Sequence, residues 1–131
     1  MKTVQAVLMI DDDSEDREIF AEIVEAIDPS IKFVGISSAE EALLQLQKEG
    51  ASLPDVIFVD LNMPVMDGRQ FLIEIKSVSH LQHIRVIIYS TSSEPRHKAE
   101  LLKLGASAFI TKPSDLSVLK NELEIAFAVN A

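Results

Sequence analysis

Five short apolar runs alternate along this chain with segments in which apolar residues recur every three or four positions. The runs favour buried strands, and the segments between them favour amphipathic helices. Their strict alternation is typical of an α/β fold, in which crossover helices join parallel strands. The predicted strands are residues 4–10, 31–36, 56–60, 86–90 and 108–111. We therefore expect one doubly wound sheet of five parallel strands.

Capping signals predict where the helices between these strands begin. Ser14 is expected to cap the first helix, with Asp16 in the first turn, where an acidic side chain favourably faces the helix dipole. Ser38 opens a capping box before the second helix. Asp13 and Asp67, which follow strand ends, are interpreted as helix caps too. The other expected boundaries are Asp28-Pro29 after the first helix, Gly50 after the second, Pro95 and Gly105 around the fourth, and Leu116 at the start of the last.

Composition limits the class of protein. A chain of 131 residues is long enough to bury the core of one domain, and we expect residues 1–131 to form a single domain. It contains no cysteine, which excludes disulfides and thiol chemistry. The net charge of −9 disfavours direct nucleic-acid binding, which normally needs a basic face. No segment has the pattern of a signal peptide or the length of a membrane span, so we expect a cytoplasmic protein.

Charged residues stand where three of the predicted strands end. Asp11 and Asp12 follow the first strand, Asp60 ends the third, and Lys112 follows the fifth. The carboxyl ends of parallel strands share one edge of a sheet, so these side chains should meet there. Three ionised carboxylates in one place need compensating charge, which one Mg²⁺ and the lysine would supply. Because an aspartate can act as a nucleophile toward a phosphoryl group, the pattern predicts a phosphate-handling site.

The order of these motifs resembles the receiver domain of two-component response regulators, over essentially the full length of the chain. The matching residues are Asp11-Asp12, the run from Asp60 to Pro64 with Asp67-Gly68, Ser90-Thr91, Gly105-Ala106 and Lys112-Pro113. Each motif stands at the corresponding end of its own predicted strand. The resemblance implies a flavodoxin-like receiver fold of five strand–helix units.

The resemblance also implies a nucleophile and a metal site. Asp60 would be the phosphoacceptor and a ligand of Mg²⁺. Asp12 would bind the metal directly, Asp11 would act mainly through water, and the backbone carbonyl of Asn62 would supply a further ligand. Asn62 and Ser92 are polar and stand two positions after Asp60 and Ser90, so both are expected to tune the lifetime of the phosphoryl group.

The remaining residues of the motif would contact the phosphoryl group and transmit its presence. Lys112 would pair with phosphoryl oxygens, and the Ser90 hydroxyl would donate a hydrogen bond to one of them, with Thr91 as the alternative donor. Ser90 and Phe109 would form the switch, although most family members have tyrosine at the position of Phe109. The Lys112-Pro113 bond is usually cis in this family.

The resemblance implies partners. A histidine kinase or a histidine phosphotransfer protein would supply the phosphoryl group, and the chain would then dock on a downstream protein or pass the group on. We expect no enzymatic activity beyond its own phosphorylation and dephosphorylation. In the last predicted helix, one apolar stripe should pack on the sheet and a second should be exposed for association with a target or a second copy. The first stripe is Leu116, Leu119, Leu123, Ala126 and Phe127, and the second is Val118, Ile125 and Val129.

Three other interpretations compete with this one. An EF-hand loop starting at Asp11 fails because Asp16 stands where that loop needs glycine. Haloacid-dehalogenase-like phosphatases also use a strand-end aspartate, Mg²⁺ and a lysine, but that fold needs a longer chain and a second acidic motif after the lysine. A phosphorylation-independent interaction module is the third. The presence of all the acids together with Ser90 and Lys112 argues against it.

Overall fold

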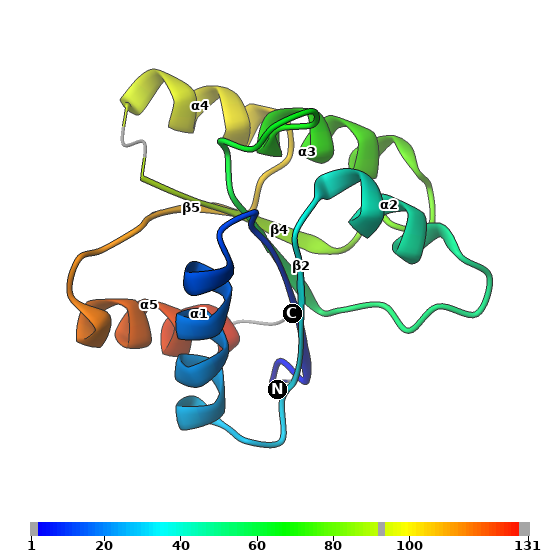
Figure 1. The fold of residues 1–131 in the computed structure, drawn as a ribbon. Coiled ribbons are helices and arrows are strands. Elements are labelled where there is room, and N and C mark those ends of the chain that lie inside the picture. Colours follow the sequence, from blue (N-terminus) through cyan, green and yellow to red (C-terminus); the bar gives the residue numbers. More distant parts are fainter. Residues whose placement is uncertain (1–2, 92–93, 129–131) are drawn as a thin grey trace.

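The structure is a computed structural model that describes residues 3–91 and 94–128 (Figure 1). In these residues five strands alternate with five helices. They are β1 (Ala6–Ile10), α1 (Ser14–Ile27), β2 (Lys32–Ile36), α2 (Ala39–Gln47), β3 (Val56–Val59), α3 (Gly68–Ser77), β4 (Arg85–Ser90), α4 (Pro95–Lys103), β5 (Ala108–Thr111) and α5 (Leu116–Ala128). The strands form one parallel sheet in the order β2-β1-β3-β4-β5, which confirms the predicted flavodoxin-like fold.

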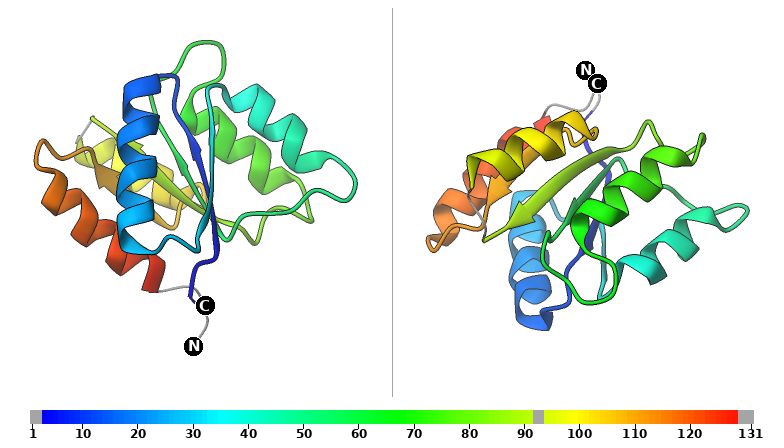
Figure 2. Two further views of the ribbon diagram at one scale, coloured as in Figure 1. Left: turned by 60° about the horizontal axis from the view of Figure 1, so that its bottom comes forward. Right: turned by 90° about the horizontal axis from the view of Figure 1, so that it is seen from above.

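Helices cover both faces of the sheet (Figure 2). Buried residues of α1 and α5 pack on one face around Phe20 and Phe58, whereas those of α2, α3 and α4 pack on the other around Phe71. The four residues of β3 are fully buried because this central strand is covered on both sides. None of the helices in the described part of the chain is both long and apolar enough to cross a membrane.

The strand boundaries differ from the predicted ones by small amounts. β1 begins at Ala6, because the Val4 amide instead donates a hydrogen bond of 3.3 Å to the carbonyl of Phe127 near the end of α5. β2 and β4 begin at Lys32 and Arg85, each within one residue of expectation. β3 ends at Val59, one residue earlier than predicted, so Asp60 follows the strand.

The prediction that Ser14 caps α1 is wrong. The interpretation of Asp13 as a cap is confirmed: its backbone is extended, and its Oδ1 accepts hydrogen bonds from the amides of Glu15 at 2.9 Å and Asp16 at 3.3 Å. Ser14 is already helical, because the chain turns into the helix one residue earlier than expected. The cap of α3 is as predicted, since Asp67 accepts from the amide of Gln70 at 2.8 Å.

The last helix has two apolar stripes, with one correction. Leu119, Leu123 and Phe127 are buried against the sheet as predicted. Leu116 is 51% exposed, contrary to the prediction, because it is the first residue of α5 and precedes the buried stripe by a turn. On the other stripe Ile125 is 68% exposed. Val118 is exposed too, and Val129 lies outside the described residues.

Candidate functional site

Two of the predicted acids lie side by side at the carboxyl edge of the sheet. Asp11 follows β1 and Asp60 follows β3, and these strands pair directly, with Ile10 opposite Val59. The amide of Asp60 donates to the carbonyl of Ile10 at 3.0 Å, which extends the pairing to the acids themselves. Asp11 is fully buried and Asp60 is 8% exposed. Together with the exposed Asp12 they bring one carboxylate oxygen each to within 4.8 Å of one another.

Lys112 reaches the same point from the end of β5. Its Nζ donates to Oδ2 of Asp11 and to Oδ2 of Asp16 at 2.8 Å each, and to Oδ2 of Asp60 at 3.3 Å. Its backbone amide donates to the carbonyl of Ser90 at 2.8 Å, which fixes the start of the side chain beside β4. The predicted Lys112 and acids are therefore brought together, and Asp16 from the first turn of α1 joins them. Sequence reasoning had explained Asp16 by the helix dipole alone.

The charges at this edge perturb one another. Burial raises the pKa of Asp11, and hydrogen bonds from Lys112 and from the Asp13 amide oppose that shift only in part. Burial by itself lowers the pKa of Lys112, but the carboxylates of Asp11, Asp16 and Asp60 outweigh it, so the pKa of Lys112 is raised. The ammonium is therefore firmly protonated.

Tyr89 forms an apolar wall of the site that sequence reasoning missed. Its side chain is 6% exposed on β4, and Nζ of Lys112 lies 5.3 Å from the centroid of its ring. Burial raises the pKa of the Tyr89 phenol to about 12, an effect that the positive charge of Lys112 partly opposes. A cation over an aromatic face is attracted by the negative face of the ring. Tyr89 therefore adds to the contacts that hold the ammonium in place.

Ser90, at the end of β4, is linked to Asp60 through Asn62. It is fully buried, and Nδ2 of Asn62 donates to its Oγ at 3.4 Å. The amide of Asn62 also donates to Oδ1 of Asp60 at 3.3 Å, so this residue links the acid to the hydroxyl. Thr91 is exposed, which favours Ser90 as the hydroxyl of the site. The metal-ligand role of the Asn62 carbonyl stays a prediction, and Ser92 lies outside the described residues.

Gly68 allows α3 to begin directly against the backbone of the site. A Cβ atom at this position would lie 2.5 Å from the carbonyl oxygen of Asp60 and 2.9 Å from Cα of Leu61. The Gly68 amide donates to the carbonyl of Leu61 at 3.0 Å, which closes the loop after β3. In that loop Val65 has a φ of 69°, in the left-handed region that a β-branched residue rarely adopts. The glycine therefore sets how tightly the loop folds under Asp60.

Known proteins of one family resemble this chain over most of its length. The family model described as the response regulator receiver domain matches residues 7–124. The chain belongs to the response regulator receiver family. Receivers are signalling modules, and this assignment removes the phosphatase alternative. A curated relative, the two-component response regulator ORR1 of Oryza sativa subsp. japonica, is 33% identical over 126 residues, which are 90% of this chain and 54% of that protein. The receiver chain thus spans about half the length of this relative.

Two solved structures share the fold of this receiver. The phosphorylated cyanobacterial phytochrome response regulator RcpA is 30% identical with a TM-score of 0.86, and the match covers 97% of this chain and 96% of that one. The Mn²⁺-bound form of the response regulator Rcp1 is 25% identical with a TM-score of 0.81, covering 92% of this chain and 89% of that one. The whole described sheet, with its helices, is therefore of the receiver type.

The aromatic residue that the receiver motif places on β5 is half-buried here. Phe109 packs at the margin of the core cluster under α3 and α4. Nζ of Lys98, on α4, lies 5.4 Å from the centroid of its ring. Phe109 therefore joins β5 to α4 through a cation–π contact and apolar packing. Its role as a switch residue stays a prediction.

The Lys112-Pro113 bond differs from the family expectation. The described residues contain no cis peptide bond, so this bond is trans in the structure, and the expectation of a cis bond is not met. The Lys112 side chain nevertheless reaches the acids, because its position is set by the hydrogen bond of its amide to Ser90.

The donor set suits Mg²⁺. Asp11, Asp12 and Asp60 offer carboxylate oxygens, the ligands that a hard dication prefers, and the exposed Asp12 leaves an open side for water ligands.

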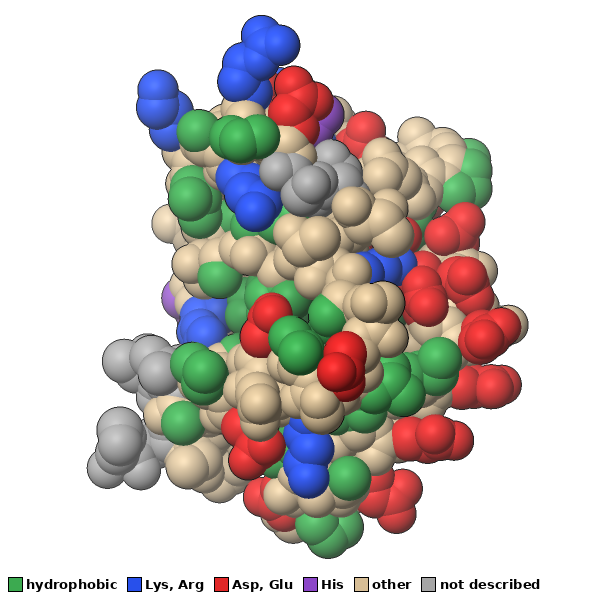
Figure 3. All heavy atoms as spheres, turned by 90° about the vertical axis from the view of Figure 1, so that its left-hand side faces the viewer, with side chains coloured by type: hydrophobic (Ala, Val, Ile, Leu, Met, Phe, Trp, Pro, Cys, Tyr) green, Lys and Arg blue, Asp and Glu red, His purple; other side chains and the backbone are tan. Residues whose placement is uncertain are grey.

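Figure 3 shows acidic side chains gathered along one edge of the face seen from the left-hand side of Figure 1. Because Asp16 adds a fourth carboxylate to the three predicted ones, the charge balance expected from sequence is short of one positive charge.

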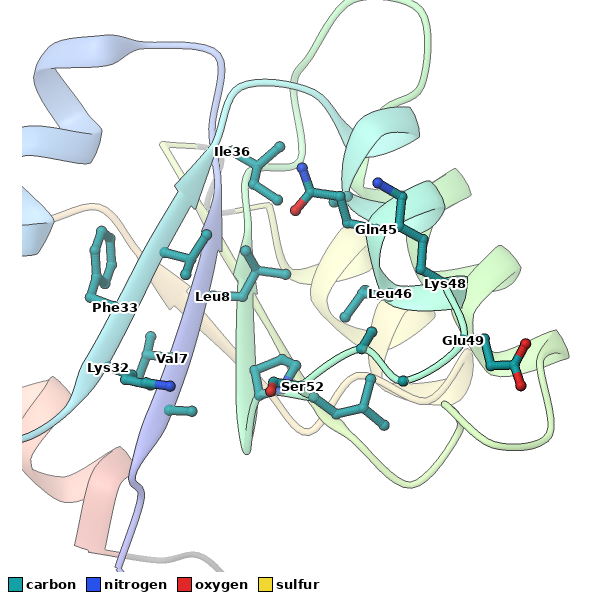
Figure 4. Close-up of a pocket in the computed structure, with 17 residues that line it drawn as sticks. Val7, Leu8, Lys32, Phe33, Ile36, Gln45, Leu46, Lys48, Glu49 and Ser52 are labelled. Carbon is teal, nitrogen blue, oxygen red and sulfur yellow. The ribbon is translucent and has the colours of Figure 1, made fainter.

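A cavity on another part of the molecule lies apart from these acids. It has a volume of about 620 Å³ and lies between the edge strand β2, β1 and α2, with Leu8, Ile36 and Leu46 around it (Figure 4). None of the acids at the strand ends lines it. A smaller cavity of about 230 Å³ adjoins the site, because Asn62 is among the residues that line it. The acids at the strand ends and Lys112 therefore lie apart from the cavity beside β2.

Proposed function

We propose that this chain accepts a phosphoryl group on Asp60 from a histidine kinase or a histidine phosphotransfer protein. One observation carries the proposal: Asp11, Asp12 and Asp60 converge within 4.8 Å, and the ammonium of Lys112 contacts two of them. A carboxylate nucleophile beside a fixed cation and a set of oxygen ligands suits phosphoryl transfer, which depends chiefly on positioning and charge neutralisation.

The transfer would proceed by attack of an Asp60 carboxylate oxygen on the phosphorus of a phosphohistidine. The new P–O bond forms as the P–N bond breaks, and the imidazole nitrogen leaves with the electron pair and takes a proton from solvent. Lys112 would pair with phosphoryl oxygens during the transfer. Asp11, Asp12, Asp60 and the Asn62 carbonyl would hold Mg²⁺, whose positive charge offsets the charge on the phosphoryl group.

A phosphoryl group on Asp60 would change the contacts of Ser90. The Ser90 hydroxyl oxygen accepts a hydrogen bond from Nδ2 of Asn62, and a phosphoryl oxygen would be a strong acceptor for the hydroxyl proton. Movement of Ser90 toward that acceptor would open space beside β4, which Phe109 would fill from β5. Because Phe109 has no hydroxyl, the moved ring would be held by packing alone. The conformational shift is limited to the free energy by which the group binds one state better than the other.

The output would be a change in a protein-binding surface. We propose that this surface includes the exposed stripe of Val118 and Ile125 on α5, and that it associates with a downstream protein or a second copy of the chain. The protein would act in the cytoplasm, where its phosphodonors would be found. The alternative, an interaction module that works without phosphorylation, leaves the convergence of Asp60, Lys112 and Ser90 without a purpose.

Labelling by a small phosphodonor tests the proposal. Acetyl phosphate should add one phosphoryl group to the protein in the presence of Mg²⁺ and far less in EDTA, as measured by intact mass. Asp12→Ala should weaken Mg²⁺ binding and remove most of the Mg²⁺ stimulation, because an oxygen ligand is lost. Asp13→Asn is the matched control, since Asn caps a helix as well as Asp. If Mg²⁺ stimulated the labelling of Asp12→Ala as strongly as that of Asp13→Asn, the assignment of Asp12 as a metal ligand would be wrong.

A further inference from the structure

Asp16 is a partner of Lys112 that the receiver motif does not include. Its Oδ2 accepts from Nζ of Lys112 at 2.8 Å, although 96 residues separate the two. Its place in the first turn of α1 is fixed by the cap residue Asp13, whose Oδ1 accepts a hydrogen bond from the Asp16 amide at 3.3 Å. Asp16 is not among the acids that converge as a metal-ligand set. Its contact with Lys112 therefore needs an explanation other than metal binding.

The ammonium of Lys112 makes a longer contact with the proposed phosphoacceptor than with the other two acids. An ammonium has three N–H donors, and here they meet Asp11, Asp16 and Asp60. The contacts with Asp11 and Asp16 are 2.8 Å, whereas the contact with Asp60 is 3.3 Å. A phosphoryl group on Asp60 would bring about −1.5 to −2 charges to that side. For a short contact with it, Lys112 must move toward Asp60 and lengthen another contact.

The contact with Asp16 is the one that can be lost at low cost. The Asp11 side chain has no exposed surface, so Lys112 compensates a carboxylate that water cannot reach. The Asp16 side chain is 35% exposed, so water can replace the ammonium there. The two contacts therefore differ in what it costs to break them. The contact with the buried Asp11 is costly to lose, whereas the contact with the partly exposed Asp16 can be replaced by water.

We propose that Asp16 competes with the phosphoryl group on Asp60 for Lys112, and so acts as a positioning residue that favours the unphosphorylated state. The inference rests on the proposed function, because it concerns the same site. In the unphosphorylated protein Asp16 draws the ammonium toward α1. In the phosphorylated protein Lys112 moves to the phosphoryl oxygens, and water hydrates Asp16.

Beryllofluoride binding tests this inference, since beryllofluoride stands in for the phosphoryl group on a carboxylate. Asp16→Asn keeps the shape of the side chain and removes its charge. At saturating Mg²⁺ it should lower the beryllofluoride concentration for half-saturation about fivefold, because a tenfold change in affinity corresponds to about 1.4 kcal/mol and one partly exposed charged contact is worth less. Asp16→Ala, which removes the partner altogether, should shift it in the same direction. Asp16→Glu keeps the carboxylate and should stay near the parent value.

Glu15→Gln is the matched control. Glu15 is an exposed acid in the same helical turn, and Lys112 is not among its described contacts. Its neutralisation should change the affinity less than twofold. A purely structural role for Asp16 would loosen the start of α1 and weaken binding, so the sign of the change separates the two explanations.

Each outcome decides between the explanations. Unchanged or weaker binding by Asp16→Asn and Asp16→Ala would overturn the inference while leaving the proposed function standing. An equal gain in Glu15→Gln would also overturn it, because general charge and not the contact with Lys112 would then be responsible. A parent protein that does not bind beryllofluoride at all would overturn the proposed function, and this inference with it.

Discussion

Nζ of Lys112 lies 3.3 Å from Oδ2 of Asp60, although the two residues are 52 positions apart and come from the ends of β5 and β3. β4 lies between these two strands, so the lysine side chain spans the width of one strand to reach the acid. The pair exists only when β3, β4 and β5 are aligned. The contact between Lys112 and Asp60 therefore depends on the pairing of these three strands.

Lys112→Ala should impair the response to a phosphoryl group. The substitution removes the cation that contacts Asp11, Asp16 and Asp60, so an incoming anion meets uncompensated negative charge. We expect the affinity for beryllofluoride to fall by about tenfold or more, since loss of one charged contact in a largely buried site costs roughly 1.5–3 kcal/mol. The role of Lys112 would be contradicted if the variant bound beryllofluoride normally and the amide NMR signals of β4 and β5 shifted as they do in the parent protein.

The Tyr89 phenol should lose its proton at a higher pH than an ordinary tyrosine. Its pKa of about 12 in the folded protein exceeds the ordinary value of 10.0, because burial disfavours the phenolate. The folded state binds the phenol proton more tightly than the unfolded state. The contribution of Tyr89 to stability is therefore fully present below pH 10 and is lost as the pH rises from there through 12. The chain has one tyrosine and no tryptophan, so ultraviolet absorbance of the phenolate reports this residue alone. A midpoint near 10 in the folded protein would show that the ring is open to water.

Gly68→Ala should destabilise the protein and disturb the site together. The new Cβ would clash with the carbonyl oxygen of Asp60 and with Leu61, both backbone contacts that cannot swing aside. Overpacking of this kind costs about 1–3 kcal/mol of unfolding free energy, which urea denaturation measures. Gln70→Ala, at an exposed position of the same helix, should change stability by only about 0.5 kcal/mol. Equal stability of the two variants would show that the start of α3 can shift freely.

Ile125→Glu should abolish association through α5. Ile125 is 68% exposed on a helix that already buries its other stripe, so a charge there leaves the core intact. We expect beryllofluoride to raise the sedimentation coefficient of the parent protein and not that of the variant. Lys120→Glu adds negative charge at another exposed position of α5 and serves as the control. A parent that sediments as a monomer in both conditions would remove self-association, and unimpaired target binding by Ile125→Glu would remove the stripe as a docking surface.

The sheet and the core of the site were predictable because their signals are local. β3 is buried on both faces, so its residues form a continuous apolar run, and Asp60 marks its end in the sequence as in the structure. The same logic located Asp11 and Lys112. Parallel pairing then brings strand ends together whatever the length of the crossovers, so the edge at which these residues meet followed from the fold class.

The parts that sequence reasoning missed depend on contacts between distant segments. Asp16 has a sufficient local explanation in the helix dipole, and its contact with Lys112 depends on how the start of α1 lies against the end of β5. Tyr89 has the pattern of an ordinary strand residue, and its place beneath the ammonium depends on the path of the Lys112 side chain. Asp13 and Ser14 were both predicted as caps, and only Asp13 is confirmed, because the choice between them depends on where the chain leaves β1.

Asp60→Asn replaces the side chain that would carry the phosphoryl group. The substitution keeps the size of the side chain and removes the nucleophilic carboxylate, so the fold should be retained. With acetyl phosphate and Mg²⁺, the parent and the Asp13→Asn control should gain one phosphoryl group by intact mass, and Asp60→Asn should gain none. Undiminished labelling of a folded Asp60→Asn variant would show that another residue carries the phosphoryl group and that Asp60 is not the phosphoacceptor.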